Sequence, residues 1–419
     1  MPTPSTSESL RRTEPRWSEL EAIAPVRMAS AADSVEGVLP ARVVAPEDTG
    51  QVSSVLKWAN ERDVHIVARG GGSKLGWSNL PSGMDLVLSL EKFQSLVEHA
   101  WQDMTVTVQA GATIATLQAE LAKHGQRLPL DALWPDRSTV GGVIATNESG
   151  ALRLRFGSIR DLILGATAVL ANGTIARSGG RVVKNVAGYD LPKLFTGSMG
   201  TLGVITEVTL RTYPLPHSTR TLSFRFQEVA AANRYMLAVS DTTLVPASMQ
   251  LRTSNDEAAV VDLCFEGLEE GIAAQVLRAT ELATAAPVLA PAHEVWNSRE
   301  KLWNDAENAV IGKFSVLPSS IVDCVEVIRS RSSQFKIVAQ SLGLGFFRVR
   351  LDNLESFLKL RAALQKLRGS FTVLHAPIEM KKNIDVFGEL TTAYPLMVRI
   401  KQQFDPKGIL SPGRFVGGI

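Results

Sequence analysis

The spacing of apolar residues along 42–72 predicts a strand, a helix and a second strand. An apolar run at 43–45 precedes Asp48 and Thr49, either of which can cap a helix. Apolar residues three or four positions apart then mark one helix face, at Val52, Val55, Leu56 and Ala59. The run at 65–68 predicts a buried strand that leads into the glycine-rich stretch ARGGGSKLGW. This order of elements is typical of ligand sites in α/β folds.

The same patterns continue downstream and change near residue 215. The runs DLVLSL and MTVTVQAG predict strands, and Ile114, Leu117 and Leu121 share a helix face that ends at Gly125. Residues 128–214 combine glycines with short apolar runs, which is typical of strands joined by tight turns. The sequence YPLPHS at 213–218 carries the prolines of a boundary, and strand-like runs alternate with amphipathic helices after it. We therefore predict the fold class α+β in four segments: a tail at 1–39, a first domain at 40–215, a second at 216–375 and a C-terminal segment at 376–419.

Composition narrows the classes of function. The chain has 419 residues, and 44 basic against 42 acidic side chains give a net charge of +2 with no basic block, which argues against nucleic-acid binding. Cys264 and Cys324 are too few for a disulfide framework, and the closest histidines, His99 and His124, are 25 residues apart. We expect no metal site from local motifs. No apolar stretch is long enough to span a bilayer, and the polar first sixteen residues predict a frayed tail rather than a signal peptide.

The glycine loop suggests an anion site. Without side chains at 70–72, backbone N–H groups can converge on a phosphate, and Arg69 and Lys74 would add positive charge. The loop does not match the GxxxxGK signature of nucleoside triphosphate sites or the GxGxxG signature of dinucleotide folds. A plain glycine-rich turn is the alternative. Two further stretches of this kind, at 138–165 and 180–211, favour one extended ligand lying across three loops.

The three loops together resemble a known family. The order RGGGS, TVGG…N.SG…R.G..RD and KN.AGYDL.KL..GS.GTLG.IT.V.L is similar to the FAD-binding domain of the flavoproteins named after vanillyl-alcohol oxidase and p-cresol methylhydroxylase. Within that family the chain most resembles the FAD-binding E subunits of bacterial glycolate oxidase. The resemblance covers 40–215 and the terminal SPGRFVGGI. It implies an FAD-binding domain of two α+β subdomains, a cap or substrate domain at 216–375, and a C-terminal segment that returns to the FAD-binding domain.

The resemblance also implies which residues hold FAD. The first loop would wrap the pyrophosphate with Arg69, Gly70, Gly71, Gly72 and Ser73. The second would line the pyrophosphate and the ribityl and isoalloxazine side with Ser138, Thr139, Gly141, Gly142, Asn147, Ser149 and Gly150. The adenine end would be covered by Gly200, Gly203 and Ile205. The first loop contains neither histidine nor cysteine, so we expect non-covalent FAD.

The implied function is that of an FAD-binding subunit of a glycolate dehydrogenase complex, which oxidises glycolate or a similar 2-hydroxy acid to the 2-oxo acid. Electrons would pass to an iron–sulfur partner, because two cysteines cannot hold a cluster that takes four thiolates. The HxGDGN.H motif of the D-type catalytic subunit of the same complex is absent. Two alternatives remain open: a self-sufficient FAD-dependent alcohol or hydroxy-acid dehydrogenase, and a scaffold subunit without catalysis. The resemblance implies a cytoplasmic protein that reaches the inner face of the plasma membrane only through its partners.

Catalytic candidates are few. His375 follows a predicted strand and is either a general base or an ordinary core or surface histidine. Arg181 and Lys184 either bind a substrate carboxylate or stabilise reduced flavin, or they lie in a solvated turn. Arg153, Arg155 and Arg160 attract an anion or pair with Asp161. Trp296 and Trp303, seven residues apart, are expected to share one helix face as a core or interface stripe.

Overall fold

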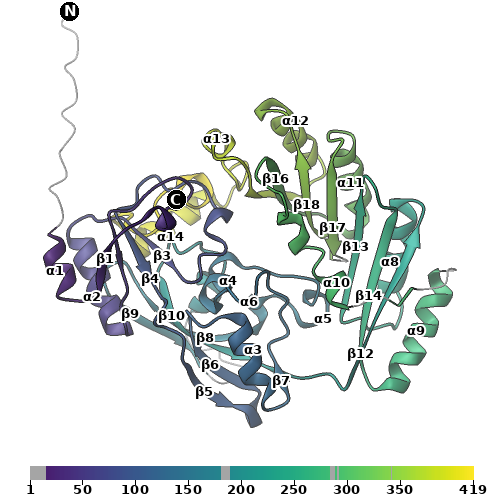
Figure 1. The fold of residues 1–419 in the computed structure, drawn as a ribbon, viewed down its shortest axis with the longest axis horizontal. Helices are drawn as coiled ribbons and strands as arrows, with labels where there is room; N and C mark the ends of the chain where they lie inside the picture. Colours follow the sequence, from purple (N-terminus) through teal and green to yellow (C-terminus); the bar gives the residue numbers. More distant parts are fainter. Residues whose placement is uncertain (1–15, 181–188, 284–287, 290–291, 341) are drawn as a thin grey trace, which may run out of the picture.

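The computed structural model describes residues 16–180, 189–283, 288–289, 292–340 and 342–419. Two domains lie side by side (Figure 1), one built from the first half of the chain and one from the green segment that follows. The C-terminal segment, drawn in yellow, packs back on the first domain. Both domains combine helices and sheets, which confirms the predicted α+β class.

The first sheet carries the strand that leads into the glycine loop. Its order is β1-β2-β4-β3, with bounds Val26–Met28 for β1, Arg42–Val44 for β2, Ile66–Arg69 for β3 and Leu86–Ser89 for β4. β2 and β3 both pair with β4 in parallel. Helix α2, Thr49–Glu61, connects β2 to β3, and the Asp48 side chain caps it by accepting a hydrogen bond of 2.8 Å from the Gln51 N–H.

The predicted tail at 1–39 needs a correction. Helix α1 spans Trp17–Glu21, and β1 pairs antiparallel with β2 as an edge strand of the first sheet. Both elements therefore belong to the first domain. The sequence pattern missed β1 because it has three residues, two of them exposed, and so has no apolar alternation to detect.

The second sheet is antiparallel, in the order β5-β6-β10-β8-β9. Its strands are β5 Leu96–Ala100, β6 Thr105–Gln109, β8 Ile163–Val169, β9 Ile175–Gly179 and β10 Val204–Arg211. The helices between them are α3 Ile114–Ala122, α4 Val140–Thr146, α5 Arg153–Phe156, α6 Ile159–Leu162 and α7 Leu191–Phe195. A short ladder joins β7, Gln126–Arg127, to β11, Tyr213–Pro214. One hydrophobic core joins the two sheets, from Leu56 of α2 to Val106 of β6.

The second domain is one eight-stranded sheet in the order β15-β12-β14-β13-β17-β18-β16-β19. Its strands are β12 Ser218–Phe226, β13 Ser248–Ser254, β14 Ala259–Gly267, β15 Val288–Leu289, β16 Ala309–Ser315, β17 Phe335–Gln340, β18 Leu344–Arg350 and β19 Ser370–His375. Four helices cover one face, namely α8 Val229–Ser240, α9 Glu269–Ala283, α11 Ile321–Arg329 and α12 Leu354–Gln365. The other face is turned toward the first domain (Figure 1).

The expectation that Trp296 and Trp303 share one helix face is wrong. Trp296 ends α10, Ala292–Trp296, whereas Trp303 ends a separate 3-10 turn at Glu300–Trp303. The chain bends between them. The Trp296 indole donates to the Thr221 hydroxyl, and Trp303 stacks on Trp77 of the first domain.

The C-terminal segment completes the first domain. After α13, Ile378–Lys381, and α14, Tyr394–Phe404, the chain runs along β3, where the Ile66 N–H donates to the Ile409 carbonyl and the Ser411 N–H to the Ile66 carbonyl. The Lys401 ammonium fixes this course through Asp405 at 2.6 Å and the Leu410 carbonyl at 2.9 Å. Across the described ranges, no helix combines the length and apolar character needed to cross a bilayer.

Candidate functional site

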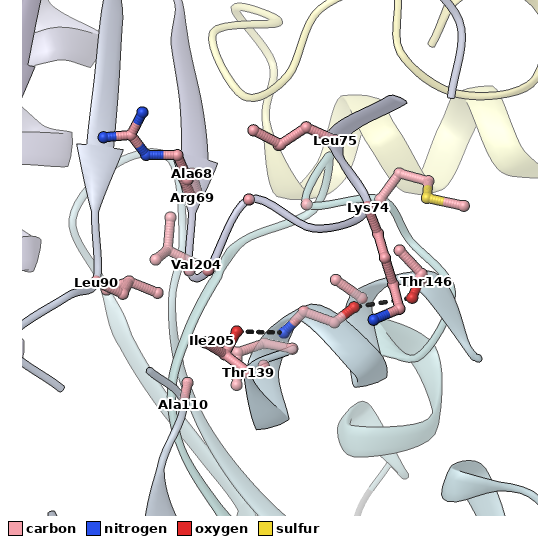
Figure 2. Close-up of a pocket in the computed structure, with 18 of the residues that line it drawn as sticks. Ala68, Arg69, Lys74, Leu75, Leu90, Ala110, Thr139, Thr146, Val204 and Ile205 are labelled. Carbon is pink, nitrogen blue, oxygen red and sulfur yellow. Dashed lines mark hydrogen bonds between the residues drawn. The ribbon is translucent and has the colours of Figure 1, made fainter. Parts of the chain in front are cut away.

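A cavity lies where the glycine loop after β3 meets α4 and the start of β10. Figure 2 shows Leu90, Ala110 and Ile205 toward one end, and Lys74 and Thr146 toward the other. Its wall is mostly backbone and small side chains. The lining residues are Ala68, Arg69, Gly70, Gly71, Gly72, Ser73, Lys74, Leu75, Leu90, Ala110, Thr139, Gly141, Gly142, Ala145, Thr146, Ser198, Met199, Gly200, Gly203, Val204, Ile205 and Arg414.

The first loop requires glycine because it touches the second loop. A side chain at Gly71 would overlap the Arg137 carbonyl oxygen, and one at Gly70 would overlap the Thr139 hydroxyl. Among the described residues, the N–H groups of Gly70 to Ser73 donate no hydrogen bond. Free backbone donors beside a cavity suit an anionic ligand such as a diphosphate.

The second and third loops supply the opposite wall. Thr139 caps α4 by accepting from the Gly142 N–H at 3.3 Å, and Asn147 ends the helix in a left-handed conformation with φ of +47°. The third loop is tied to this helix because the Met199 N–H donates to the Ala145 carbonyl at 2.9 Å. Within the described part of the chain, the buried Asn147 Oδ1 and Ser149 Oγ have no hydrogen-bond partner. Buried polar atoms without partners are unusual, but neither of these side chains lines the cavity.

The structure brings most of the expected cofactor residues to one cavity. Those in its wall are Arg69, Gly70, Gly71, Gly72, Ser73, Thr139, Gly141, Gly142, Gly200, Gly203 and Ile205. Ser138, Asn147, Ser149 and Gly150 lie outside this lining. Ser138 instead donates to the Leu133 carbonyl at 2.5 Å, and Gly150 packs on the Asp131 carboxylate, which a side chain there would overlap.

Arg69 contributes backbone rather than charge to the cavity. Its guanidinium donates to the buried Asp33 carboxylate at 2.9 Å and points away from the cavity (Figure 2). Asp33 also accepts two hydrogen bonds of 2.7 Å from Arg27, and these interactions hold its pKa well below the usual range. The expected charge at residue 69 thus anchors the loop.

Arg414 is a lining residue that sequence reasoning missed. It is buried, and its guanidinium donates to the Ser78 hydroxyl at 2.9 and 2.7 Å and to the Leu75 carbonyl. Burial lowers its pKa to about 10. The SPGRF motif was visible in the sequence, but its contact with a loop more than 300 residues away was not.

Lys74 joins a buried ion cluster between the two domains. Its ammonium lies 2.9 Å from the Glu148 carboxylate, whose other oxygen lies 3.1 Å from the Arg299 guanidinium of the second domain. Arg299 also donates to the carbonyls of Ser149 and Asp131. Burial lowers the pKa of Lys74, and Glu148 acts in the opposite direction. Burial also raises the pKa of Asp131, which favours its neutral form.

Three indole rings surround this cluster. Trp77 and Trp303 stack with ring centroids 5.8 Å apart, and Trp134 meets Trp303 edge-on at 5.2 Å. The Lys74 ammonium lies 5.7 Å from the Trp77 ring and 5.8 Å from the Trp134 ring. Apolar side chains of both domains, including Leu133 and Phe346, complete the contact. Water is therefore largely excluded from the ion cluster.

None of the three catalytic candidates can be placed in the cavity wall: one does not line it, and the other two are not among the described residues. His375 Nε2 lies 2.8 Å from the Ala306 carbonyl, and burial lowers its pKa, so a neutral ring that donates to this carbonyl is favoured. Arg181 and Lys184 fall outside the described residues. In the described ranges, no three His, Cys, Asp or Glu side chains are grouped so as to hold a metal ion.

The cavity wall consists largely of backbone and small side chains, with loop N–H groups that donate no hydrogen bond among the described residues and with Lys74 at one end. These features suit an extended cofactor that carries a diphosphate. Comparison with known families identifies that cofactor. The FAD binding domain family matches residues 40–179, and the C-terminal domain family of FAD linked oxidases matches residues 356–415. FAD is thus the cofactor, and the cavity fits it because the loop donors face the space that its diphosphate needs.

Individual relatives agree with these matches. The glycolate oxidase subunit GlcD of Bacillus subtilis is 33% identical over 57% of this chain, and the match spans about half, 51%, of that relative's length. The D-lactate dehydrogenase of Archaeoglobus fulgidus is 28% identical, with 89% of this chain and 91% of that protein aligned. A solved alkyldihydroxyacetonephosphate synthase shares the fold with a TM-score of 0.71 at 17% identity, over 90% of this chain and 77% of that one. Two segments of the chain, residues 40–179 and 356–415, thus match families of FAD-linked oxidoreductases, and most of the chain shares its fold with the solved structure.

Proposed function

We propose that this protein oxidises a small 2-hydroxy acid to the 2-oxo acid with non-covalent FAD. Support comes from the relatives, whose names specify glycolate and D-lactate as substrates. The observation that carries the proposal is a cation on the second domain, Lys313, that has no hydrogen-bond or ion-pair partner among the residues that the structure describes. A carboxylate is the common feature of these substrates and the natural partner for such a cation.

Lys313 lies in β16 on the sheet face turned toward the first domain. It is directly opposite Phe346 of β18, and Phe346 packs in the same cluster as Trp77 and Leu133. Residues opposite each other on adjacent strands project to the same face. The Lys313 side chain therefore lies between the domains, beside the wall of indole rings.

The surroundings of Lys313 are positively charged. Burial lowers its pKa, and Arg153 and Arg299 lower it further, whereas Glu148 opposes them. Among the described residues, the Lys313 ammonium makes no ion pair or hydrogen bond, and Glu148 is already shared by Lys74 and Arg299. A partly buried cation without a counter-ion is costly unless a ligand supplies one. We assign the substrate carboxylate to Lys313.

In this scheme each residue has a defined task. Lys313 binds the carboxylate and so orients the α-carbon toward the cavity, while Trp77, Trp134 and Trp303 exclude water. The glycine loop binds the diphosphate of FAD through backbone N–H groups. When bound, FAD would accept a hydride equivalent, two electrons and one proton, from the α-carbon, and the hydroxyl proton would be released to the medium.

The test is anaerobic reduction of the FAD-loaded protein by glycolate and by D-lactate, followed through the visible flavin absorbance. We expect Lys313→Met to raise the substrate concentration needed for half-maximal reduction by a factor of ~10–100, because one charged hydrogen bond of about 1.5–3 kcal/mol is lost. The spectrum and FAD content should not change. Lys336→Met, an exposed lysine on β17, is the matched control and should leave the concentration unchanged.

Two further outcomes distinguish the alternatives. We propose that the chain acts as a subunit of a complex with a D-type catalytic subunit and an iron–sulfur subunit. Its two cysteines, Cys264 and Cys324, are too few to hold an iron–sulfur cluster, and both are buried with a raised thiol pKa, so a partner has to supply the cluster. Reduction by substrate but turnover only with added partner subunits supports this assembly. Turnover by the lone chain with an artificial acceptor supports a self-sufficient dehydrogenase. FAD that stays oxidised with every hydroxy acid would favour a scaffold role and sink the substrate assignment.

A further inference from the structure

We propose that Lys74 is the cation that sets the electron affinity of the bound FAD, and that Glu148 tunes it by partial neutralisation. The proposal rests on FAD binding and on the proposed function insofar as the substrate lies against the second domain, and it does not depend on which hydroxy acid is oxidised. Lys74 belongs to the glycine loop and lines the FAD cavity, whereas Glu148 does not line it. A ligand in the cavity therefore meets the ammonium before the carboxylate.

The position of Lys74 identifies the part of FAD that it faces. FAD is extended, with its diphosphate between the adenosine and the reacting ring. Leu90 and Ala110 lie toward one end of the cavity and Lys74 toward the other (Figure 2), and the loop glycines, which precede Lys74 in the chain, also line it. The Lys74 end borders the second domain, through Trp303 and through Arg299, which shares Glu148 with Lys74. A ring that must exchange electrons with a substrate held by the second domain belongs at this end.

The charges at this end do not cancel. The side chains of Lys74 and Glu148 are 4% and 1% exposed, and that of Arg299 is 6% exposed. Two cations, Lys74 and Arg299, share the one carboxylate of Glu148, and burial shifts the pKa of Asp131 upward, away from its charged form. The cluster therefore carries a net positive charge in a region from which water is excluded. Coulomb interactions are several times stronger in such a region than in water.

A net positive charge beside the ring favours its reduced, electron-rich state. The protein groups near a cofactor's ring are established determinants of its electronics, and fixed charges act without reorganisation. Removing Lys74 should therefore disfavour reduction, and removing the negative charge of Glu148 should favour it. The two changes have opposite signs, whereas damage to the fold would move both variants in the same direction.

The experiment measures the reduction potential of the FAD-loaded protein by equilibration with a reference dye. For Lys74→Met we expect the ratio of reduced to oxidised FAD at a fixed potential to fall at least tenfold, a shift of about 30 mV to more negative values for two electrons. For Glu148→Gln we expect a shift of similar size to more positive values. Lys74→Arg keeps the charge and should remain within threefold of the unmodified protein.

Titration of each variant with oxidised and with reduced FAD measures the same ratio by linkage, so weakened binding does not prevent the test. Lys57→Met changes a lysine on the outer part of α2 and serves as the control for loss of a charge. The quantity compared is the ratio of the affinities for reduced and for oxidised FAD. The same ratio in Lys74→Met and in the unmodified protein would overturn the proposal. Shifts of the same sign in Lys74→Met and Glu148→Gln would do so as well, and would leave the cluster as a structural contact between domains.

Discussion

Gly71 occupies a position where the first and second loops of the FAD cavity touch. Its α-carbon faces the Arg137 carbonyl oxygen so closely that no side chain fits. The same residue contributes an N–H group that donates no bond within the described chain. One glycine thus allows the loop contact and leaves a donor for the ligand.

We expect Gly71→Ala to lose bound FAD and to lower the free energy of unfolding by about 1–3 kcal/mol, because the loop must move to relieve the overlap. The ratio of flavin absorbance to protein absorbance measures the first effect, and urea unfolding the second. Gly271→Ala is the matched control, since an added methyl group there meets open space on helix α9. Retention of full FAD by Gly71→Ala would contradict this account of the loop.

At the scale of elements, Asp33 joins two strands of the first sheet. Arg27 of β1 and Arg69 of β3 both donate to it, and its own turn is capped by the Ser30 N–H at 2.8 Å. The interactions depress the pKa of Asp33 in the folded protein. Its contribution to stability is therefore present above the unfolded pKa near 3.9 and is lost as pH falls below that value.

We expect Asp33→Asn to destabilise the protein by about 2 kcal/mol at pH 7, since bonds to a charged group are lost. The difference between the variant and the unmodified protein should shrink as pH falls from 5 to 3. Urea unfolding at several pH values measures it. A difference that stays constant over this range would show that the charge of Asp33 is not what stabilises the strands.

Sequence patterns predict elements well where local chemistry decides them. Asp48 and the apolar spacing after it predict α2, and the structure has the same cap and the same buried face. Sequence patterns fail where contacts between residues far apart in the sequence determine the local structure. β1 forms because β2 accepts it at the sheet edge, and the chain bends between Trp296 and Trp303, where Arg299 reaches the first domain. The loop glycines and Lys74 were expected in one site and line one cavity, but the contact of Lys74 with Glu148, which Arg299 shares, was not predictable.

At the scale of the whole molecule, Arg299 is one of the buried polar links between the domains. It is 5% exposed and bonds to Glu148 and to the carbonyls of Ser149 and Asp131. These partners are about 150 to 170 residues away in the sequence, so no local pattern could reveal them. The bonds hold the loop after α4 against the second domain.

For Arg299→Met we expect a loss of about 3–5 kcal/mol, because Glu148 would be left with one of its two cations in a buried site. Calorimetry should then resolve two thermal transitions where the unmodified protein has one. Arg329→Met removes an exposed arginine that lies 3.9 Å from Glu326 and should leave the profile unchanged. A single transition at the original temperature would indicate that apolar contacts alone couple the domains.

The lining of the FAD cavity by both Thr146 and Arg414 has a consequence for biosynthesis. About 270 residues separate the two, and the whole second domain lies between them. At roughly 5–20 residues per second, a ribosome needs on the order of 10–60 s to cover that interval. During this time the glycine loops are outside the ribosome. Arg414 and the C-terminal segment that runs along β3, which complete the pocket, have not yet been synthesised. Cofactor capture is thus a late event in the life of the nascent chain, after the second domain has emerged.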